Sequence, residues 1–161
     1  MPGITTTISA AVSPNSPAPG GFTWYRNGVI VPGENNSTIV VDVDHLGEYY
    51  ATVNDVNGCN SQSGTVTITD SSSNIVFIYP SPTRGIFQVR YLSQAGNRLI
   101  PRYLNIFDAK GSRVYSRVYS INAPYEKMSV DMTAYGNGVY TVELADGSGQ
   151  RIATGRVIVT H

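Results

Sequence analysis

Apolar and polar residues alternate along much of the chain, and alternation with a period of two predicts β-strands. In the first half it places Ile39 with Val41, and Tyr49 with Ala51, on common faces. No long window repeats apolar residues at the spacing of three and four that an amphipathic helix requires. We therefore expect an all-β protein, with first-half strands over residues 4–12, 22–26, 29–31, 38–43, 49–53 and 65–69.

Turn signals separate the strands. Asn27-Gly28 is the strongest two-residue hairpin signal, and the Pro- and Gly-rich run Ser13–Gly21 predicts a loop. The second half has turn sequences at 93–97, 108–111 and 146–149. Between them the pattern predicts about seven strands of a second antiparallel sandwich, over residues 74–79, 85–92, 103–107, 113–121, 127–132, 139–144 and 151–159.

A serine run followed by two prolines separates the two halves. Pro80 and Pro82 each fix φ near about −65° and remove a backbone donor. The stretch predicts a polar linker and then a stiff lead into the second domain. We expect two consecutive antiparallel β-sandwiches, at residues 1–70 and 77–161, joined by a linker at 71–76.

Composition indicates a folded protein, since 41% of the 161 residues are hydrophobic and 14% are charged. Charge is unevenly spread. Residues 1–74 hold one basic and six acidic side chains, a net charge of −5, and residues 75–161 hold ten basic and five acidic, or +5. This asymmetry indicates either a basic face for an anionic partner or two unrelated modules. The one hint of nucleic-acid binding, the run Arg113–Tyr119, fits a strand equally well, so we expect no nucleic-acid partner.

Several classes of chemistry lack the residues they require. The single cysteine, Cys59, excludes an intrachain disulfide, and no metal-type Cys/His spacing is present. Only two histidines occur, and no nucleophile-elbow, phosphate-loop or paired-histidine motif is found. We expect no catalytic residues, no cofactor and no membrane-spanning segment. The sequence shows no signal peptide, so we expect a fragment whose first domain can lack its own beginning.

Two binding sites remain open in the first half. Asp42, Asp44, Glu48 and Asp55 carry the oxygen ligands that calcium prefers, although their spacing fits no calcium loop. Tyr25 and Tyr50 would stack on sugar rings, or else are ordinary solvent-side strand positions.

The first half resembles the immunoglobulin-like and PKD-like repeats of bacterial surface proteins. Trp24 matches the core tryptophan of such domains, and Tyr49 matches the tyrosine-corner residue. Ala51 stands where antibody domains keep a cysteine. The repeats also carry Trp-Tyr-x-Asn-Gly, Gly-x-Tyr and Asp-x-Asn-Gly-Cys in that order, as this chain does. In such repeats the last cysteine often pairs with one on an early strand, and Cys59 has no such partner here.

The second half resembles the C-terminal sorting domain of type IX secretion, found on exported proteins of the Bacteroidetes. The resemblance covers residues 76–160. It is carried by Tyr-Pro-x-Pro-x-x-Gly from Tyr79, Ile-Phe-Asp-x-x-Gly-x-x-Val from Ile106, Gly-Val-Tyr-x-Val from Gly138, and a closing run from Gly149 to Val159. Ser81 stands where the family usually has asparagine, and Arg156 where lysine is common.

This resemblance implies a delivery function, in which the folded sandwich is recognised by the type IX outer-membrane translocon, with its shuttle protein and sortase as further partners. The sortase would cut the linker, and the cargo would be released or joined to anionic lipopolysaccharide at the cell surface after passing the periplasm. The alternative is a surface adhesin or a pair of carbohydrate-binding modules. The expected cleavage region is Asp70, Ser71, Ser72, Ser73 and Asn74.

We expect the final hairpin, Gly138–Val159, to be recognised, with an edge strand offering backbone pairing. The glycines and the two prolines have a simpler explanation as turn formers. The candidate recognition residues are Pro80, Pro82, Gly85, Gly111, Gly138, Tyr140, Arg151, Gly155, Arg156 and Val157.

Overall fold

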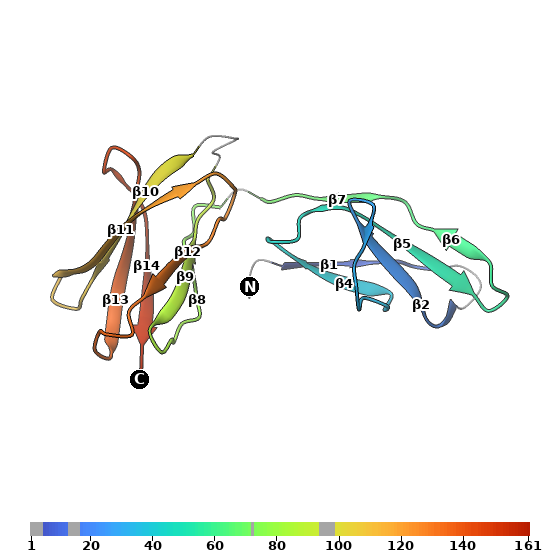
Figure 1. The fold of residues 1–161 in the computed structure, drawn as a ribbon, viewed down its shortest axis with the longest axis horizontal. Helices are drawn as coiled ribbons and strands as arrows, with labels where there is room; N and C mark the ends of the chain where they lie inside the picture. Colours follow the sequence, from blue (N-terminus) through green and yellow to red (C-terminus); the bar gives the residue numbers. More distant parts are fainter. Residues whose placement is uncertain (1–4, 13–16, 72, 94–98) are drawn as a thin grey trace. The chain divides into compact units, whose positions relative to one another are not determined.

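The computed structural model describes residues 5–12, 17–71, 73–93 and 99–161, with the side chains of residues 17–20 left aside. Within these ranges the chain is built from β-strands and contains no helix (Figure 1). It divides into two compact units, residues 1–71 and 72–161. The sheets are antiparallel and form immunoglobulin-like sandwiches, which confirms the predicted fold class.

The first domain contains a two-stranded sheet and a larger one. In the larger sheet the strand order is β3-β2-β5-β6, and β7 also pairs with β5. β1 pairs with β4 in the smaller sheet. The strands are β1 (Thr5–Ser9), β2 (Pro17–Arg26), β3 (Val29–Ile30), β4 (Thr38–Asp42), β5 (Gly47–Asp55), β6 (Asn60–Gln62) and β7 (Val66–Ile68).

The first core forms around Trp24, which is 2% exposed. Its indole Nε1 donates a hydrogen bond of 2.8 Å to the carbonyl of Asn36, as a buried indole requires. The other buried members are Ile39, Val41, Tyr49 and Ala51. These are the inward positions that the period-two pattern predicted.

The Asn27-Gly28 turn joins β2 to β3, as predicted. Both residues have positive φ, +50° and +78°, which is the backbone of a two-residue hairpin that twists with its strands. Asn27 also ties this turn to β5, because its Oδ1 accepts the amide of Glu48 at 2.9 Å.

Two predictions for the first domain are wrong. Residues 17–21 were expected as part of a loop, but they belong to β2. Pro17 pairs with Asp55, and the register shifts between Pro17 and Phe22. Residues 13–16 of the expected loop lie outside the described part. β6 was missed because all three of its residues are polar and exposed. It is a strand because β5 supplies its backbone partners.

The second domain packs a four-stranded sheet, in the order β11-β10-β13-β14, against a three-stranded sheet, β12-β9-β8. All seven predicted strands are present, although β8 begins later than expected and β10 begins earlier. The predicted turn at 93–97 lies mostly outside the described residues. The strands are β8 (Phe77–Tyr79), β9 (Ile86–Arg90), β10 (Ile100–Phe107), β11 (Arg113–Ile121), β12 (Met128–Asp131), β13 (Gly138–Ala145) and β14 (Arg151–Val159).

Alternating positions of the strands form the second core. On β13, Val142 and Leu144 are fully buried, and on β12 the same is true of Met128. Burying one such side chain stabilises the fold by roughly 1.5–3 kcal/mol. The remaining buried members of this core are Phe87, Val89, Leu104, Ile106, Ile121, Val130, Met132, Tyr140, Val157 and Val159.

Candidate functional site

The Pro-x-Pro segment runs from β8 onto the last strand of the domain. The Thr83 amide donates to the carbonyl of Ile158 at 2.8 Å, and the Thr160 amide donates to the carbonyl of Thr83 at 2.8 Å. The Ile158 amide donates to Ser81 Oγ at 3.2 Å. Pro80 and Pro82, both exposed and both preceded by cis peptide bonds, flank Ser81 in this segment.

This contact changes the expected recognition edge. β14 ends the strand order of its sheet, so it is an edge strand as predicted. However, residues 81–83 cover the end of that edge near Ile158. As far as the described residues show, the uncovered length is therefore the part of β14 from Arg151 to Arg156, and the sequence alone did not indicate this.

Gly85 holds the corner that follows. Its φ is +110°, and a Cβ there would lie 2.7 Å from the backbone N and Cα of Thr133. Thr83, 5% exposed, braces the same corner: its Oγ1 donates to the carbonyl of Ile86 at 2.7 Å and accepts the amide of Gly85 at 3.2 Å. Both the conformation and the space require glycine. The sequence analysis named Gly85 as a candidate but did not name Thr83. The position of Thr83 between Pro82 and Gly85 could have indicated that it has a structural role at this corner.

Gly155 lets the two sheets approach at one side of the sandwich. A Cβ at this position would lie 2.7 Å from Ile78 Cδ1 and 3.7 Å from Val76 Cβ. β14 and β8 come close here (Figure 1). Close packing against Ile78 therefore explains why residue 155 is a glycine.

Gly111 closes one of three loops that share a single geometry, beginning at Asp55, Asp108 and Asp146. In each loop the aspartate Oδ1 accepts hydrogen bonds from the amides two and four residues later. Both bonds are 2.9 Å in the Asp108 loop, and Gly111 has φ of +82°. The turn itself therefore accounts for Gly111.

The other candidates divide into buried and exposed residues. Val157 is fully buried and Tyr140 is 7% exposed, so neither offers its side chain to a partner while the domain is folded. This corrects their place among the recognition residues. Gly138 has ordinary space around it, its Cβ position lying 3.6 Å from the Tyr140 ring. Arg151 and Arg156, by contrast, are exposed on β14.

The candidate cleavage region lies between β7 and β8. None of its described residues belongs to a strand. Ser71 and Asn74 are exposed, Asp70 and Ser73 are half-buried, and Ser72 lies outside the described residues. Proteases cut most readily in such segments without regular structure.

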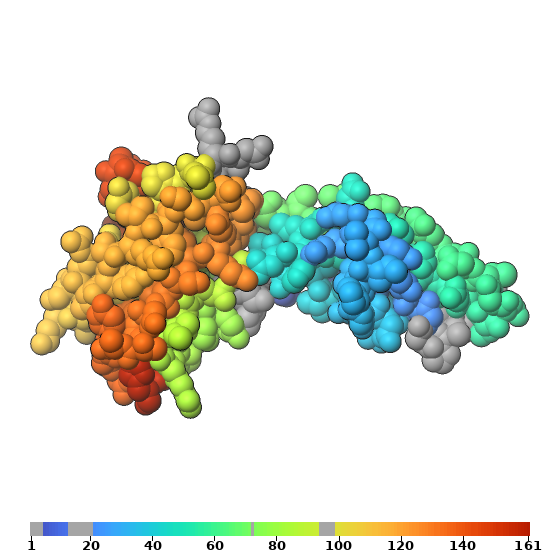
Figure 2. Space-filling view, viewed as in Figure 1, coloured from blue at the N-terminus to red at the C-terminus, as the bar shows by residue number. Residues whose placement is uncertain are grey.

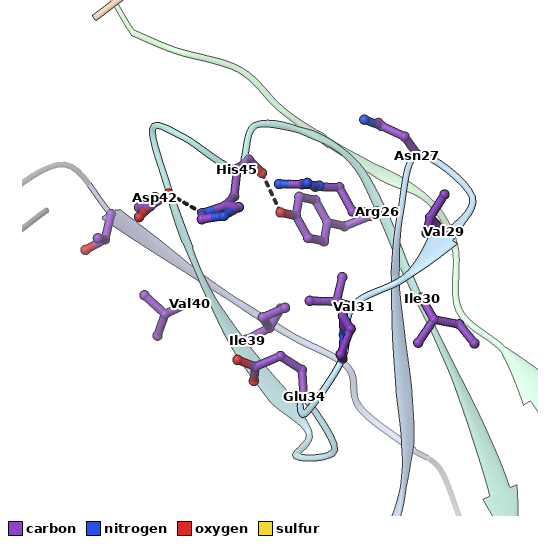
Figure 3. A pocket seen from close by; sticks show the side chains of 13 residues that line it. Arg26, Asn27, Val29, Ile30, Val31, Glu34, Ile39, Val40, Asp42 and His45 are labelled. Atoms are coloured by element: carbon purple, nitrogen blue, oxygen red, sulfur yellow. Dashed lines mark hydrogen bonds and ion pairs between the residues drawn. The ribbon is translucent and has the colours of Figure 1, made fainter. Parts of the chain in front are cut away.

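A pocket of about 710 Å³ opens between β3 and β4 of the first domain (Figure 3). Val31 and Ile39 line it with other aliphatic side chains, while Arg26, Asp42 and His45 lie at one end. His45 Nδ1 is 2.6 Å from Asp42 Oδ1.

Tyr49 forms part of the same pocket wall. Its hydroxyl donates to the carbonyl of His45, which is the predicted tyrosine corner. Burial raises the pKa of Tyr49, and the nearby Arg26 partly opposes this. The hydroxyl therefore keeps the proton that the corner requires.

The possible calcium ligands are not gathered into a site. Asp42 Oδ1 accepts the amide of Asp44 at 3.0 Å, and Asp55 Oδ1 is engaged by its own loop. Among the described residues, no three His, Cys, Asp or Glu side chains are placed to hold a metal ion.

Tyr25 and Tyr50 stack on each other, with ring centres 4.6 Å apart and planes at 7°. Each ring therefore covers one face of the other. Only the outer face of each ring is therefore left for stacking on a sugar.

Comparison with known families decides what the second domain is. Residues 77–160, more than half of the chain, match the model of the secretion system C-terminal sorting domain. The chain belongs to this family. The resemblance drawn from the motifs is thereby confirmed, and the second domain is a type IX sorting signal of the kind carried by exported proteins of the Bacteroidetes. Sorting domains are not catalytic in themselves, and they direct export to the cell surface or the medium through the type IX system.

Solved structures similar to the chain include dimeric latent PorU from Porphyromonas gingivalis, with a TM-score of 0.44 and 15% identity over 97% of this chain. The chain spans 18% of that PorU chain. Fibronectin(III)-like modules of Clostridium thermocellum CbhA match with a TM-score of 0.34 and 15% identity, over 98% of this chain and 85% of theirs. No curated protein matches the sequence. In the part of the chain that the structure describes, no helix is long and apolar enough to cross a membrane.

Proposed function

We propose that this chain is the non-catalytic end of an exported protein, in which an immunoglobulin-like spacer precedes a sorting signal read by the type IX outer-membrane translocon. The observation that carries this proposal is the family membership of residues 77–160. The chain would reach the translocon from the periplasm, with the shuttle protein and the sortase as further partners.

The sortase step of this proposal uses the linker. Its described residues, Asp70, Ser71, Ser73 and Asn74, lie outside the strands of both domains, and proteases cut most readily in segments without regular structure. Cutting here would free the cargo together with the first domain. The cargo would then be released or joined to anionic lipopolysaccharide.

The recognition surface we propose is the final hairpin, and within it the uncovered edge of β14. Arg151 and Arg156 are exposed along this edge, and an edge strand presents unpaired backbone groups to a partner. The net charge of +5 over residues 75–161 supports an anionic or acidic partner surface.

A secretion assay tests the proposal. Residues 1–161 are fused behind a periplasm-directed fluorescent protein in a bacterium with the type IX machinery, beside a fusion that lacks Gly138–His161. We expect the intact fusion to reach the surface or the medium, shortened by the mass of the second domain, and the trimmed fusion to stay in the periplasm.

Point variants separate recognition from folding, because removing the hairpin also removes two core strands. Arg151→Glu/Arg156→Glu reverses two exposed charges, and Arg151→Lys/Arg156→Lys keeps them. We expect the Glu variant to be retained and the Lys variant to be exported. If the intact fusion stays in the periplasm although it is folded, the sorting function fails and an adhesin becomes the function to test. If both point variants are exported equally, the hairpin assignment alone is wrong.

A further inference from the structure

β11 forms the edge of the four-stranded sheet opposite to β14. It is nine residues long and pairs on one side with β10, from Ile121 opposite Ile100 to Arg113 opposite Phe107. In the described part of the chain no strand lies along its other side. The β10–β11 hairpin lies at the margin of the second domain (Figure 1), and its yellow-to-orange atoms are at the surface in Figure 2.

The side chains along β11 follow a regular pattern. Tyr115, Arg117 and Tyr119 lie opposite Ile106, Leu104 and Arg102 of β10, and the strand period places all three on one face. The register shifts between Arg113 and Tyr115, so Arg113, opposite Phe107, lies on the other face. The Arg117 guanidinium lies 5.0 Å from the centre of the Tyr119 ring, within cation–π range. Arg117 and the two tyrosines therefore form one surface, and Arg113 lies at the same edge of the sheet on its other face.

The tyrosines of this surface are held in place. The hydroxyls of Tyr115 and Tyr119 are 3.3 Å apart, and the Tyr119 hydroxyl donates to the carbonyl of Ser129 on β12. Burial, and then the bond with Tyr115, raise the pKa of Tyr119, so this hydroxyl remains protonated. The Tyr135 hydroxyl donates to the carbonyl of Val114 at 2.9 Å at the start of the strand.

Positive charge is concentrated on the β10–β11 hairpin. Lys110, Arg113 and Arg117 are all exposed. Among the described residues none of the three takes part in an ion pair. The nearby carboxylate of Asp108 turns its Oδ1 to the amides of its own loop. The β10–β11 hairpin therefore presents positively charged side chains to a partner molecule.

We propose that the free edge of β11, from Tyr115 to Tyr119, binds an extended acidic peptide by adding it as a fifth strand to the sheet. Two observations select this occupant together. An unpaired strand edge is satisfied by another peptide backbone, and the exposed arginines select acidic side chains. A polyanion without a peptide backbone would satisfy only the second requirement.

The spacing sets a rule for the peptide. Arg113 and Arg117 are four residues apart, which is roughly 13 Å along a strand, and the register shift between them places them on opposite faces of the sheet. The added strand therefore needs acidic residues on both of its faces to lie beside both arginines. This surface is at the far edge of the sheet from the hairpin proposed for the translocon, and it does not depend on that proposal.

Fluorescence anisotropy with the full chain tests the inference. The probe is a labelled, end-blocked peptide built from two Asp-Asp-Val-Val repeats, which places Asp on both faces of an extended strand. We expect binding, and we expect Arg113→Glu/Arg117→Glu to weaken it by roughly tenfold or more, because like charges then face each other. The matched control, Arg84→Glu/Lys127→Glu, makes the same charge change on residues of neither edge strand and should alter the affinity by less than about threefold, since charges beyond a screening length interact weakly.

A second peptide tests strand addition itself. Replacing each Val by Pro keeps the charges but removes half of the backbone donors, and we expect its binding to be lost. Amide exchange should slow at residues 116–120 of β11 when the Asp-Val peptide binds. Equal weakening by the two double variants would show that the peptide responds to net charge alone. Tight binding of the Pro peptide, or unchanged amide exchange, would exclude strand addition. Each of these results overturns the proposal. Should Arg113→Glu/Arg117→Glu unfold, Arg113→Gln/Arg117→Gln gives the same comparison.

Discussion

The Tyr140 hydroxyl donates a hydrogen bond of 2.7 Å to the carbonyl of Gly136, four residues upstream. Tyr49 makes the same bond to His45 in the first domain. Each tyrosine follows by two residues the glycine that begins its strand, Gly138 in β13 and Gly47 in β5. The Gly-x-Tyr motif of each half is therefore a tyrosine corner that fixes the start of a core strand.

Removing the hydroxyl of Tyr140 should weaken the second domain modestly. In Tyr140→Phe the ring stays packed, but the bond to Gly136 is lost. Because Gly136 is exposed, water can satisfy its carbonyl, and we expect a loss of about 1 kcal/mol in the free energy of unfolding. Urea unfolding measures this, with Tyr103→Phe as the control at a tyrosine that is 37% exposed. Equal effects of the two substitutions would contradict the role of the corner.

Gly85 and Gly136 should respond very differently to alanine. At Gly85 a Cβ meets the Thr133 backbone and the φ of +110° is strained, whereas at Gly136 nothing lies within 4 Å. We expect Gly85→Ala to destabilise the chain by about 2 kcal/mol or more, and Gly136→Ala to have little effect. Thermal and urea unfolding of the two variants decide this, and a mild Gly85→Ala would show that the corner can relax.

Asp146 links the stability of the second domain to acid pH. Hydrogen bonds from the Ser148 side chain, and from the amides of Gln150 and Ser148, lower the pKa of this carboxyl below its ordinary value of 3.8. A lowered folded-state pKa stabilises the fold above the unfolded value, and that stabilisation is lost as the pH falls through the folded value. We expect Asp146→Ala to reduce the loss of stability between neutral pH and pH values below 3.8.

The test is urea unfolding of both proteins across this range, with an NMR titration of the Asp146 carboxyl. A titration midpoint at or above 3.8 would refute the prediction. So would an unchanged acid sensitivity of the variant.

Proline in the linker should block removal of the sorting domain without blocking export. Ser71→Pro/Ser73→Pro fixes φ and removes two backbone donors in the region where we propose the cut. We expect the exported fusion to keep its full mass, as seen on immunoblots, while Ser71→Ala/Ser73→Ala is shortened normally. A proline variant that is shortened normally would place the cut elsewhere.

The sequence was enough to predict much of the local structure. The Asn27-Gly28 hairpin, the glycine turn at Gly111 and the inward positions of β12 and β13 follow from φ preferences and side-chain period. The tyrosine corner at Tyr49 was indicated by the resemblance to immunoglobulin-like domains, whereas the one at Tyr140 was not predicted. These depend on neighbours within a few residues. The order of such motifs was also enough to indicate the sorting family.

The sequence did not predict which distant segments contact each other. Ser81 bonds the amide of Ile158, 77 residues away, and this contact covers part of the edge that the sequence offered for recognition. Gly155 is fixed by Ile78 across the sandwich. β10 begins at Ile100 because β11 supplies a partner as far as Ile121. No local pattern encodes which strand another strand will meet.

The sequence by itself determined the fold class, the turns and the family, because these rest on backbone preference and on alternation along one strand. The tertiary structure alone decided which candidate residues are buried, as Val157 is, and which strand edges have no partner among the described residues, as that of β11 has none. Burial and edge exposure depend on the order of strands in the sheets, and that order is set by the packing of both cores together.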